Sequence, residues 1–282
     1  MNVLSLFDGM SCGQIALNRC GIKYENYFAS EIKKHAIEVT QHNYPKTIQL
    51  GNIKDIKKQD LPQIDLILAG SPCQDFSRGN KTRDGLDGQK SSLFFEFYRL
   101  YKECKPKYFI LENVIMPPAD YEYLSRLMDT YPVRINSSTV SAQYRDRLYW
   151  TNIGREYRDL FGFRYSDIPQ PKDKRLYLKD ILTSGFTDKL KSRCLLTNTG
   201  HINENKEYLL NRYKTTGMIT VVFEKEDLSV ESLRTFNQIE MERLQTVPEN
   251  YTGIVDVNKA SDLLGDGWTV DVISHILNYI NK

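Results

Sequence analysis

Short runs of apolar residues alternate with stretches of helical periodicity along the first half of the chain. Continuous apolar runs are typical of strands buried on both faces, whereas a helix repeats its apolar positions every three or four residues. The runs predict strands at residues 2–7, 24–30, 64–69 and 108–111, and the periodic stretches predict helices at 12–20, 33–43 and 92–104. This alternation indicates an α/β fold, with a doubly wound, mostly parallel sheet.

The periodicity weakens between about residues 154 and 227, where prolines interrupt and basic residues mix with Tyr, Thr and Asn. We interpret this stretch as a small inserted domain and predict three segments, 1–153, 154–231 and 232–282, the last of which returns to the first domain. Asn237 and Glu240 have the spacing of a capping box, which predicts a helix as far as Gln245. A last amphipathic helix is predicted at 268–278.

The composition, 40% hydrophobic and 26% charged over 282 residues, is that of a soluble globular protein. No apolar run is long enough to span a bilayer, and no charged-then-apolar leader precedes the first strand. Five cysteines without a Cys-x-x-Cys pair and four scattered histidines suggest neither a disulfide framework nor a metal site, which favours a reducing cytoplasm. The net charge of +2 permits a nucleic-acid partner without indicating one.

Reactive side chains follow the predicted strands. Cys73 comes just after the strand at 64–69, Glu112 ends the next strand, and Arg145 and Arg147 follow further on. Ligands of open α/β sheets bind at this carboxyl edge. A thiolate can add to an electron-poor ring carbon when an acid withdraws charge from the ring, and burial of Glu112 would raise its pKa for that role. Either arginine could stabilise negative charge on a ring carbonyl.

The first strand–helix turn has the features of a cofactor site. Phe7, Asp8 and Gly9 lead into it, Gly13 follows, and Glu31 at the end of the second strand could accept hydrogen bonds from a ribose diol. The glycine spacing does not match Gly-x-Gly-x-x-Gly, which disfavours a nicotinamide or flavin dinucleotide.

Taken together, these motifs resemble those of the DNA cytosine-C5 methyltransferases that use S-adenosylmethionine, of the bacterial or phage type. The resemblance covers nearly the whole chain outside the insert. Ser71-Pro72-Cys73-Gln74 is similar to the family's nucleophile motif, and Glu112-Asn113-Val114 to the motif that engages the cytosine N3 edge. The run from Gln143 to Arg147 is similar to Gln-x-Arg-x-Arg. By this resemblance the catalytic residues are Cys73, Glu112, Arg145 and Arg147, and the residues that bind S-adenosylmethionine are Phe7, Asp8, Gly9, Gly13, Glu31, Ile32, Asn52, Ile53, Pro72 and Trp268.

Three positions depart from the family pattern. Asn52 stands where the family has Asp, Asn237 where it has Thr, and Asp266 where it has Asn. The Asn52 carbonyl oxygen can still accept a hydrogen bond from an adenine amino group.

The resemblance also implies a mechanism and partners. Cys73 would add to C6 of a cytosine flipped out of double-stranded DNA while Glu112 engages N3, and C5 would take the methyl group. Residues 74–91 would form a loop that closes over the base, and the insert would be the target-recognition domain, with segments 189–194 and 211–217 suited to bases and phosphates. The resemblance implies no membrane and no metal, and the sequence does not show whether a restriction endonuclease accompanies the protein.

Other functions stay open at this stage. They are a tRNA cytosine-C5 methyltransferase, a non-catalytic DNA-binding regulator that kept the fold and, more distantly, a nicotinamide oxidoreductase. The presence of Cys73, Glu112, Arg145 and Arg147 together speaks against a degenerate regulator, because such relatives usually lose the nucleophile or the acid.

Overall fold

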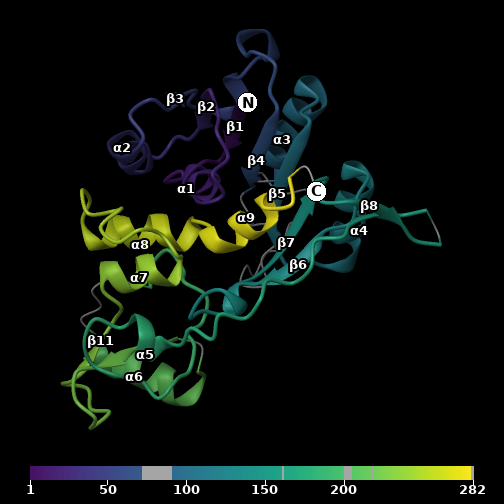
Figure 1. The fold of residues 1–282 in the computed structure, drawn as a ribbon. Coiled ribbons are helices and arrows are strands. Elements are labelled where there is room, and N and C mark those ends of the chain that lie inside the picture. The colour runs from purple at the N-terminus through teal and green to yellow at the C-terminus, as the bar shows by residue number, and fades with distance from the viewer. Residues whose placement is uncertain (72–90, 161, 200–204, 218, 281–282) are drawn as a thin grey trace. The chain divides into compact units, whose positions relative to one another are not determined.

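The structure, a computed structural model of the chain, describes residues 1–71, 91–160, 162–199, 205–217 and 219–280 (Figure 1). The chain forms two compact units. The first consists of Met1–Ile135, Asp146–Gln170 and Ile273–Lys282, and the second of Asn136–Arg145 and Pro171–Val272.

The first unit is built on a seven-stranded sheet with the order β3-β2-β1-β4-β5-β7-β6. Neighbouring strands from β3 to β5 are parallel, and β7 runs antiparallel to β5. The predicted α/β fold with a mostly parallel sheet is therefore confirmed. The strands are β1 (Asn2–Leu6), β2 (Asn26–Ser30), β3 (Ile48–Gln49), β4 (Leu66–Gly70), β5 (Tyr108–Val114), β6 (Val133–Asn136) and β7 (Asp146–Thr151).

Helices cover both faces of this sheet. Successive strand residues point to opposite faces, so each strand contributes side chains to both layers of packing. Ile67 and Ala69 of β4 share one apolar core with Phe97 of α3 and Leu124 of α4. Leu68 points to the other face, where α1 packs closely against it. The helices of this unit are α1 (Cys12–Arg19), α2 (Lys34–Asn43), α3 (Ser91–Cys104) and α4 (Pro118–Met128), together with the part of α9 (Val270–Leu277) that begins at Ile273.

The strand order reverses between β1 and β4, and ligands of doubly wound sheets bind beyond the carboxyl ends of the strands at such a reversal. One prediction at this edge was wrong. The strand at 108–111 continues to Val114, because its outer half pairs with β7, which the sequence analysis did not predict. Glu112 and Asn113 therefore lie within the strand and not at or beyond its end.

A short hairpin extends the first unit beyond β7. Its strands are β8 (Glu156–Arg158) and β9 (Arg164–Ser166). The Tyr165 ring stacks on Tyr131 with centroids 5.2 Å apart, and Tyr131 contacts Tyr121, which contacts the buried Trp150. This row of rings ties the hairpin to the core of the first unit.

The second unit contains a small apolar cluster of Tyr213, Val221, Phe223 and Leu233. The predicted capping box is confirmed, since the Asn237 side chain accepts from Glu240 N at 2.9 Å and Glu240 accepts from Asn237 N at 3.0 Å. The elements of this unit are α5 (Leu178–Ile181), α6 (Lys206–Thr215), β10 (Val222–Phe223), β11 (Leu233–Arg234), α7 (Gln238–Leu244), α8 (Val257–Asp266) and the first residues of α9. Of these, the helix α8 was not predicted from the sequence.

The two units divide the chain differently from the predicted segments 1–153, 154–231 and 232–282. Residues 154–170 belong to the first unit, whereas residues 136–145 and 232–272 belong to the second. The role of the insert in target recognition stays a prediction. In the described ranges no helix has both the length and the apolar character needed to cross a membrane.

Candidate active site

The candidate site lies at the carboxyl edge of the first unit's sheet, where the chain leaves β1, β2, β4 and β5. The turn after β1 has an unusual backbone. Phe7, Gly9 and Ser11 adopt left-handed conformations with φ of 58°, 58° and 63°. Phe7 and Ser11 carry side chains, and each such residue costs about 1–2 kcal/mol in this region. The surrounding contacts must therefore hold the turn in place, which is common where a protein binds ligands.

The carboxylate of Glu31 holds this turn to the end of β2. Its Oε2 accepts from Gly9 N at 2.8 Å, and its Oε1 accepts from Ile32 N at 2.7 Å and Lys33 N at 2.8 Å. Each carboxylate oxygen can accept two hydrogen bonds. Oε2, which accepts a single bond from the described residues, keeps capacity for a ribose hydroxyl.

Gly9 and Gly13 are glycines for different reasons. Gly9 needs its positive φ, and a Cβ there would meet nothing within 4 Å, which leaves an open cradle beside the turn. A Cβ on Gly13 would lie 2.6 Å from the Tyr27 hydroxyl oxygen and 2.7 Å from Leu68 Cδ1. Gly13 is therefore required for the packing of α1 on the sheet, a constraint that the motif alone does not reveal.

The remaining predicted cofactor residues of the first unit differ in their surroundings. Ile32 is 70% exposed, so it offers an apolar surface for a flat base. The Asn52 side chain accepts from Lys54 N at 3.1 Å and caps a short 3-10 helix. Ile53 is 3% exposed and lies in the apolar core, so its side chain serves packing and its backbone alone is left for a cofactor. An adenosine group would fit this arrangement, which combines the open space at Gly9, the exposed Ile32 side chain and the acceptor oxygen Oε2 of Glu31.

The predicted nucleophile Cys73 and its neighbour Pro72 lie outside the described residues. The strand end that leads to them is described. Gly70 pairs with Glu112 across β4 and β5, and Asn113 Nδ2 donates to Ser71 Oγ at 2.9 Å with both residues buried. The hydroxyl–amide link between Ser71 and Asn113 was not predicted.

Glu112 forms an ion pair with Arg147. Arg147 Nε lies 2.8 Å from Glu112 Oε1, and the two side chains are 15% and 9% exposed. The antiparallel pairing of β5 with β7 brings them together, since Glu112 lies opposite Tyr149 and Val114 opposite Arg147. The structure thus unites two of the four predicted catalytic residues.

Arg145 and Trp268 belong to the second unit, where both are buried. Arg145 Nη1 donates to the carbonyl oxygens of Leu195 at 3.3 Å and Gly265 at 3.1 Å and lies 3.2 Å from Cys194 Sγ. A buried guanidinium with these contacts ties two segments of its own unit together. Its predicted role toward a substrate ring stays a prediction.

Segment 189–194, predicted to contact DNA, lines a groove of the second unit to which the other predicted segment, 211–217, contributes Gly217. Arg193 Nε donates to Gly217 O at 2.8 Å, which joins segment 189–194 to segment 211–217. Lys191 donates to three backbone carbonyls, those of Ser138, Ser141 and Leu176. The groove has a volume of about 380 Å³, and it is lined by Tyr144, Asp188, Lys189, Leu190, Lys191, Arg193, Gly217, Ile219 and Thr220.

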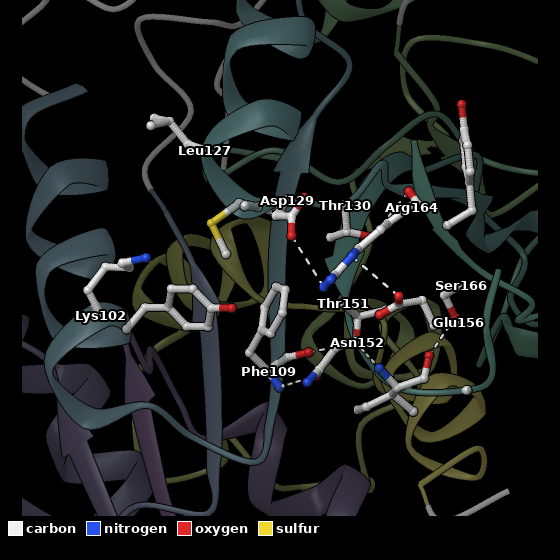
Figure 2. Close-up of a pocket in the computed structure, with 15 residues that line it drawn as sticks. Lys102, Phe109, Leu127, Asp129, Thr130, Thr151, Asn152, Glu156, Arg164 and Ser166 are labelled. Atoms are coloured by element: carbon white, nitrogen blue, oxygen red, sulfur yellow. Dashed lines mark hydrogen bonds and ion pairs between the residues drawn. The ribbon is translucent and has the colours of Figure 1, made fainter. Parts of the chain in front are cut away.

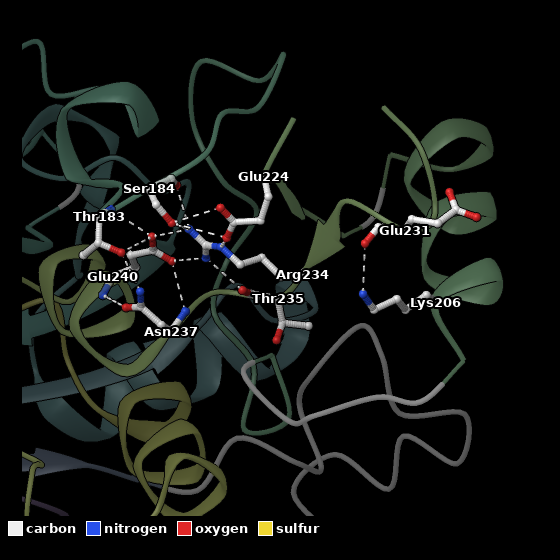
Figure 3. Close-up of polar contacts among 9 residues, drawn as sticks. All are labelled: Thr183, Ser184, Lys206, Glu224, Glu231, Arg234, Thr235, Asn237 and Glu240. Atoms are coloured by element: carbon white, nitrogen blue, oxygen red, sulfur yellow. Dashed lines mark hydrogen bonds and ion pairs between the residues drawn. The ribbon is translucent and has the colours of Figure 1, made fainter. Parts of the chain in front are cut away.

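The second unit also contains an ion-pair network centred on Glu240 and Arg234 (Figure 3). Glu240, fully buried, accepts from Arg234 Nη1 at 2.7 Å and Nη2 at 2.8 Å, and from Thr183 N at 2.9 Å. Arg234 also pairs with Glu224, which is half-exposed. The network joins α7 to β11 and to the segment after α5.

A separate cavity of about 260 Å³ lies in the first unit, near the amino end of β5 (Figure 2). Lys102, Phe109 and Asn152 line it, and Arg164 is held there between Asp129 and Glu156. Phe109 precedes Glu112 by three strand residues, so this cavity is distinct from the carboxyl edge. Among the described residues no group of acidic, His and Cys side chains could hold a metal ion.

Comparison with known proteins places this geometry in context. Residues 1–126 match the family model described as C-5 cytosine-specific DNA methylase. The orphan methyltransferase M.SPRI of Bacillus phage SPR is 29% identical over 259 residues, covering 84% of this chain and 59% of that protein. The type II methyltransferase M.NgoBV of Neisseria gonorrhoeae is 43% identical over 115 residues, covering 39% of this chain and 27% of that protein. The chain thus spans between about a quarter and three-fifths of these relatives' lengths.

Solved structures show the same fold. The DNMT2 mutant of Spodoptera frugiperda aligns with a TM-score of 0.69 at 20% identity, covering 100% of this chain and 99% of that one. The Dnmt2 methyltransferase of S. pombe aligns with a TM-score of 0.69 at 20% identity, covering 99% of this chain and 97% of that one.

Proposed function

We propose that this protein methylates C5 of cytosine in duplex DNA with S-adenosylmethionine, since residues 1–126 match the family model of the C-5 cytosine-specific DNA methylases. The observation that carries the proposal is the buried Glu112–Arg147 pair at 2.8 Å, beside the strand end that leads to Pro72 and Cys73. A carboxyl group fixed by a guanidinium is suited to engage the polar edge of a heterocyclic base.

The cofactor end of the proposal rests on the turn after β1. The cradle at Gly9, the exposed Ile32 and the Glu31 Oε2 acceptor fit the adenosine part of S-adenosylmethionine. When bound, this cofactor supplies a methyl group on a sulfonium. The chain's own contribution is to orient it through the turn's backbone and the Glu31 carboxylate.

We infer the following steps for the substrate end. The Cys73 thiolate adds to C6 of the flipped cytosine while a proton shared with Glu112 moves onto N3, so that negative charge does not accumulate on the ring. C5 would then take the methyl group as the bond between the methyl carbon and the sulfonium sulfur breaks. The C5 proton leaves to a base, the C6–S bond breaks to restore the thiolate, and N3 returns its proton to Glu112, which restores the aromatic ring. Arg147 keeps the Glu112 carboxyl aimed at N3 throughout.

Duplex DNA is the proposed substrate, read by the second unit through the groove around Lys189, Lys191 and Arg193. Lys189 and Arg193 suit phosphate contacts, whereas the three donors of Lys191 are already bound to backbone carbonyls. Tyr144, 49% exposed, offers a ring for stacking. A preference for particular bases would come from groove-edge contacts.

Transfer of tritiated methyl groups from S-adenosylmethionine tests the proposal. Unmethylated duplex DNA should accept label with the wild-type protein and none with Cys73→Ser, because serine is a far weaker nucleophile. Label on tRNA in preference to duplex DNA would contradict the proposed substrate. Full transfer by Cys73→Ser would contradict the proposed mechanism.

A further inference from the structure

The carboxyl group of Asp8 belongs to a hydrogen-bond network that links the cofactor turn to β2. Its Oδ1 accepts from the Tyr27 hydroxyl at 2.8 Å, and its Oδ2 accepts from Ser11 Oγ at 2.5 Å. Tyr27 is 2% exposed and Ser11 fully buried. Asp8 therefore bonds both to the left-handed Ser11 and to the strand beneath the turn.

The network continues beneath α1. Ser11 Oγ accepts from Gln14 Nε2 at 2.9 Å, and the same amide donates to Thr47 Oγ1 at 2.8 Å. Gln14 Oε1 in turn accepts from the Tyr24 hydroxyl at 2.8 Å. The Ser11 hydroxyl hydrogen is given to Asp8 and the Ser11 oxygen receives the Gln14 amide, so the Ser11 hydroxyl has one direction.

That directionality requires an ionised Asp8. Its hydrogen-bonded neighbours Tyr27, Ser11 and Ser5 all donate to it. A protonated carboxyl would have to donate to one of them, which would leave a buried hydroxyl hydrogen without its acceptor. The strained turn would then keep its main-chain bonds, Asp8 N to Ser30 O at 3.0 Å and Ser11 N to Asp8 O at 3.1 Å, and the bond from Gly9 N to Glu31, but it would be held less firmly at Ser11.

We propose that Asp8 is a positioning residue: through Tyr27 and Ser11 its carboxylate holds the turn 7–11 in the shape that binds S-adenosylmethionine. The inference rests on the proposed function, because it concerns the same cofactor site. It differs from the predicted role of Asp8 as a direct cofactor ligand, and it assigns roles to Tyr27, Ser11 and Gln14, which the sequence analysis did not single out.

The electrostatic surroundings make this network sensitive to pH. Burial, opposed by the hydrogen bonds from Ser11, Ser5 and Tyr27 and assisted by the nearby Glu31 carboxylate, raises the pKa of Asp8 to about 6. The other titratable groups that face Asp8 are the phenols of Tyr27 and Tyr24, which stay neutral because their own pKa values are raised. Since the binding shape needs the ionised carboxyl, cofactor affinity should fall as the pH drops through about 6.

Calorimetric titration of the full chain with S-adenosylhomocysteine between pH 5 and 8 tests the inference. The wild-type Kd should be constant above pH 7 and rise severalfold between pH 6.5 and 5. Asp8→Asn should raise the Kd about tenfold at pH 8, equivalent to ~1.4 kcal/mol. It should also abolish the inflection near pH 6, which a merely structural defect would not do.

Two Tyr→Phe variants separate the network from general damage. Tyr27→Phe removes one donor to Asp8 without removing the ring, so it should weaken binding and shift the inflection even if Asp8→Asn fails to fold. Tyr101→Phe, a matched change in the cavity near the amino end of β5, should bind like the wild type. A wild-type Kd that does not change with pH, or an inflection that survives in Asp8→Asn, would overturn the inference. Absence of any binding by the wild type at pH 8 would overturn the proposed cofactor itself.

Discussion

Substitution of Glu240 by Gln removes the charge at the centre of the second unit's ion-pair network with little change of shape. Glu240 is fully buried and accepts five hydrogen bonds, two from Arg234, two from Thr183 and one from Asn237 N. Breaking a buried pair by changing one partner costs about 3–5 kcal/mol. Arg234 is 21% exposed and keeps Glu224 as a second partner, so its charge is not stranded. We therefore expect a loss of about 2–3 kcal/mol, below that range.

Glu224→Gln is the matched control, because Glu224 pairs with the same arginine but is 46% exposed. Exposed pairs contribute about 0–1 kcal/mol, so this variant should lose much less. Urea unfolding, together with hydrogen exchange of the amides of Thr183 and Asn237, measures both effects. Equal losses in the two variants, or a loss below about 0.5 kcal/mol for Glu240→Gln, would refute the reasoning.

The same network predicts a pH dependence. Burial alone would raise the pKa of Glu240, but hydrogen bonds from Arg234 and from the amides of Thr183 and Asn237 lower it below its ordinary value of 4.5. A carboxyl whose pKa is lower in the folded state stabilises fully above the unfolded value, and this contribution is lost as the pH falls through the folded value. Wild-type stability should therefore fall below about pH 4.5 more steeply than that of Glu240→Gln.

Two further predictions concern the first unit. Gly13→Ala should lower the free energy of unfolding by about 1–2 kcal/mol, because the clash of the new methyl group with Tyr27 and Leu68 costs more than the higher helix propensity of alanine returns. Urea unfolding measures this loss, and an unchanged midpoint would contradict the close packing. Arg147→Met should lower the single-turnover rate of methyl transfer at least tenfold, because Glu112 loses the partner that orients it, and the Kd for S-adenosylhomocysteine should not change. A higher Kd with an unchanged rate would place Arg147 at the cofactor instead.

Most of the parallel core of the fold was predictable because β1, β2, β4 and β5 follow short apolar runs that end at turns, whereas the two-residue strand β3 was not predicted. β5 and β7 show where this reasoning stopped. The extension of β5 to Val114 depends on pairing with β7. β7 carries mixed residues at its start, Asp146 and Arg147, and its partner lies more than thirty residues away. Pairing between distant segments is decided by tertiary structure and leaves no local periodicity.

The residues of the candidate site were likewise predictable only in part. Motif residues such as Glu31 and Glu112 were predictable, because the strand ends position them at one edge. The Asp8–Tyr27 bond was not, since Tyr27 looks like one more buried aromatic residue of a strand. Gly13 leaves room for the Tyr27 hydroxyl where α1 approaches β2, and this contact can be seen only in three dimensions.

Covalent capture of the protein on duplex DNA that contains 5-fluorocytosine tests the central claim most directly. Fluorine at C5 cannot leave as a proton does, so the C6–S bond would persist after methyl transfer. We predict an adduct that survives denaturation, requires S-adenosylmethionine, and maps by peptide mass spectrometry to Cys73. Binding that is reversible under these conditions, or an adduct on another cysteine, would contradict the account.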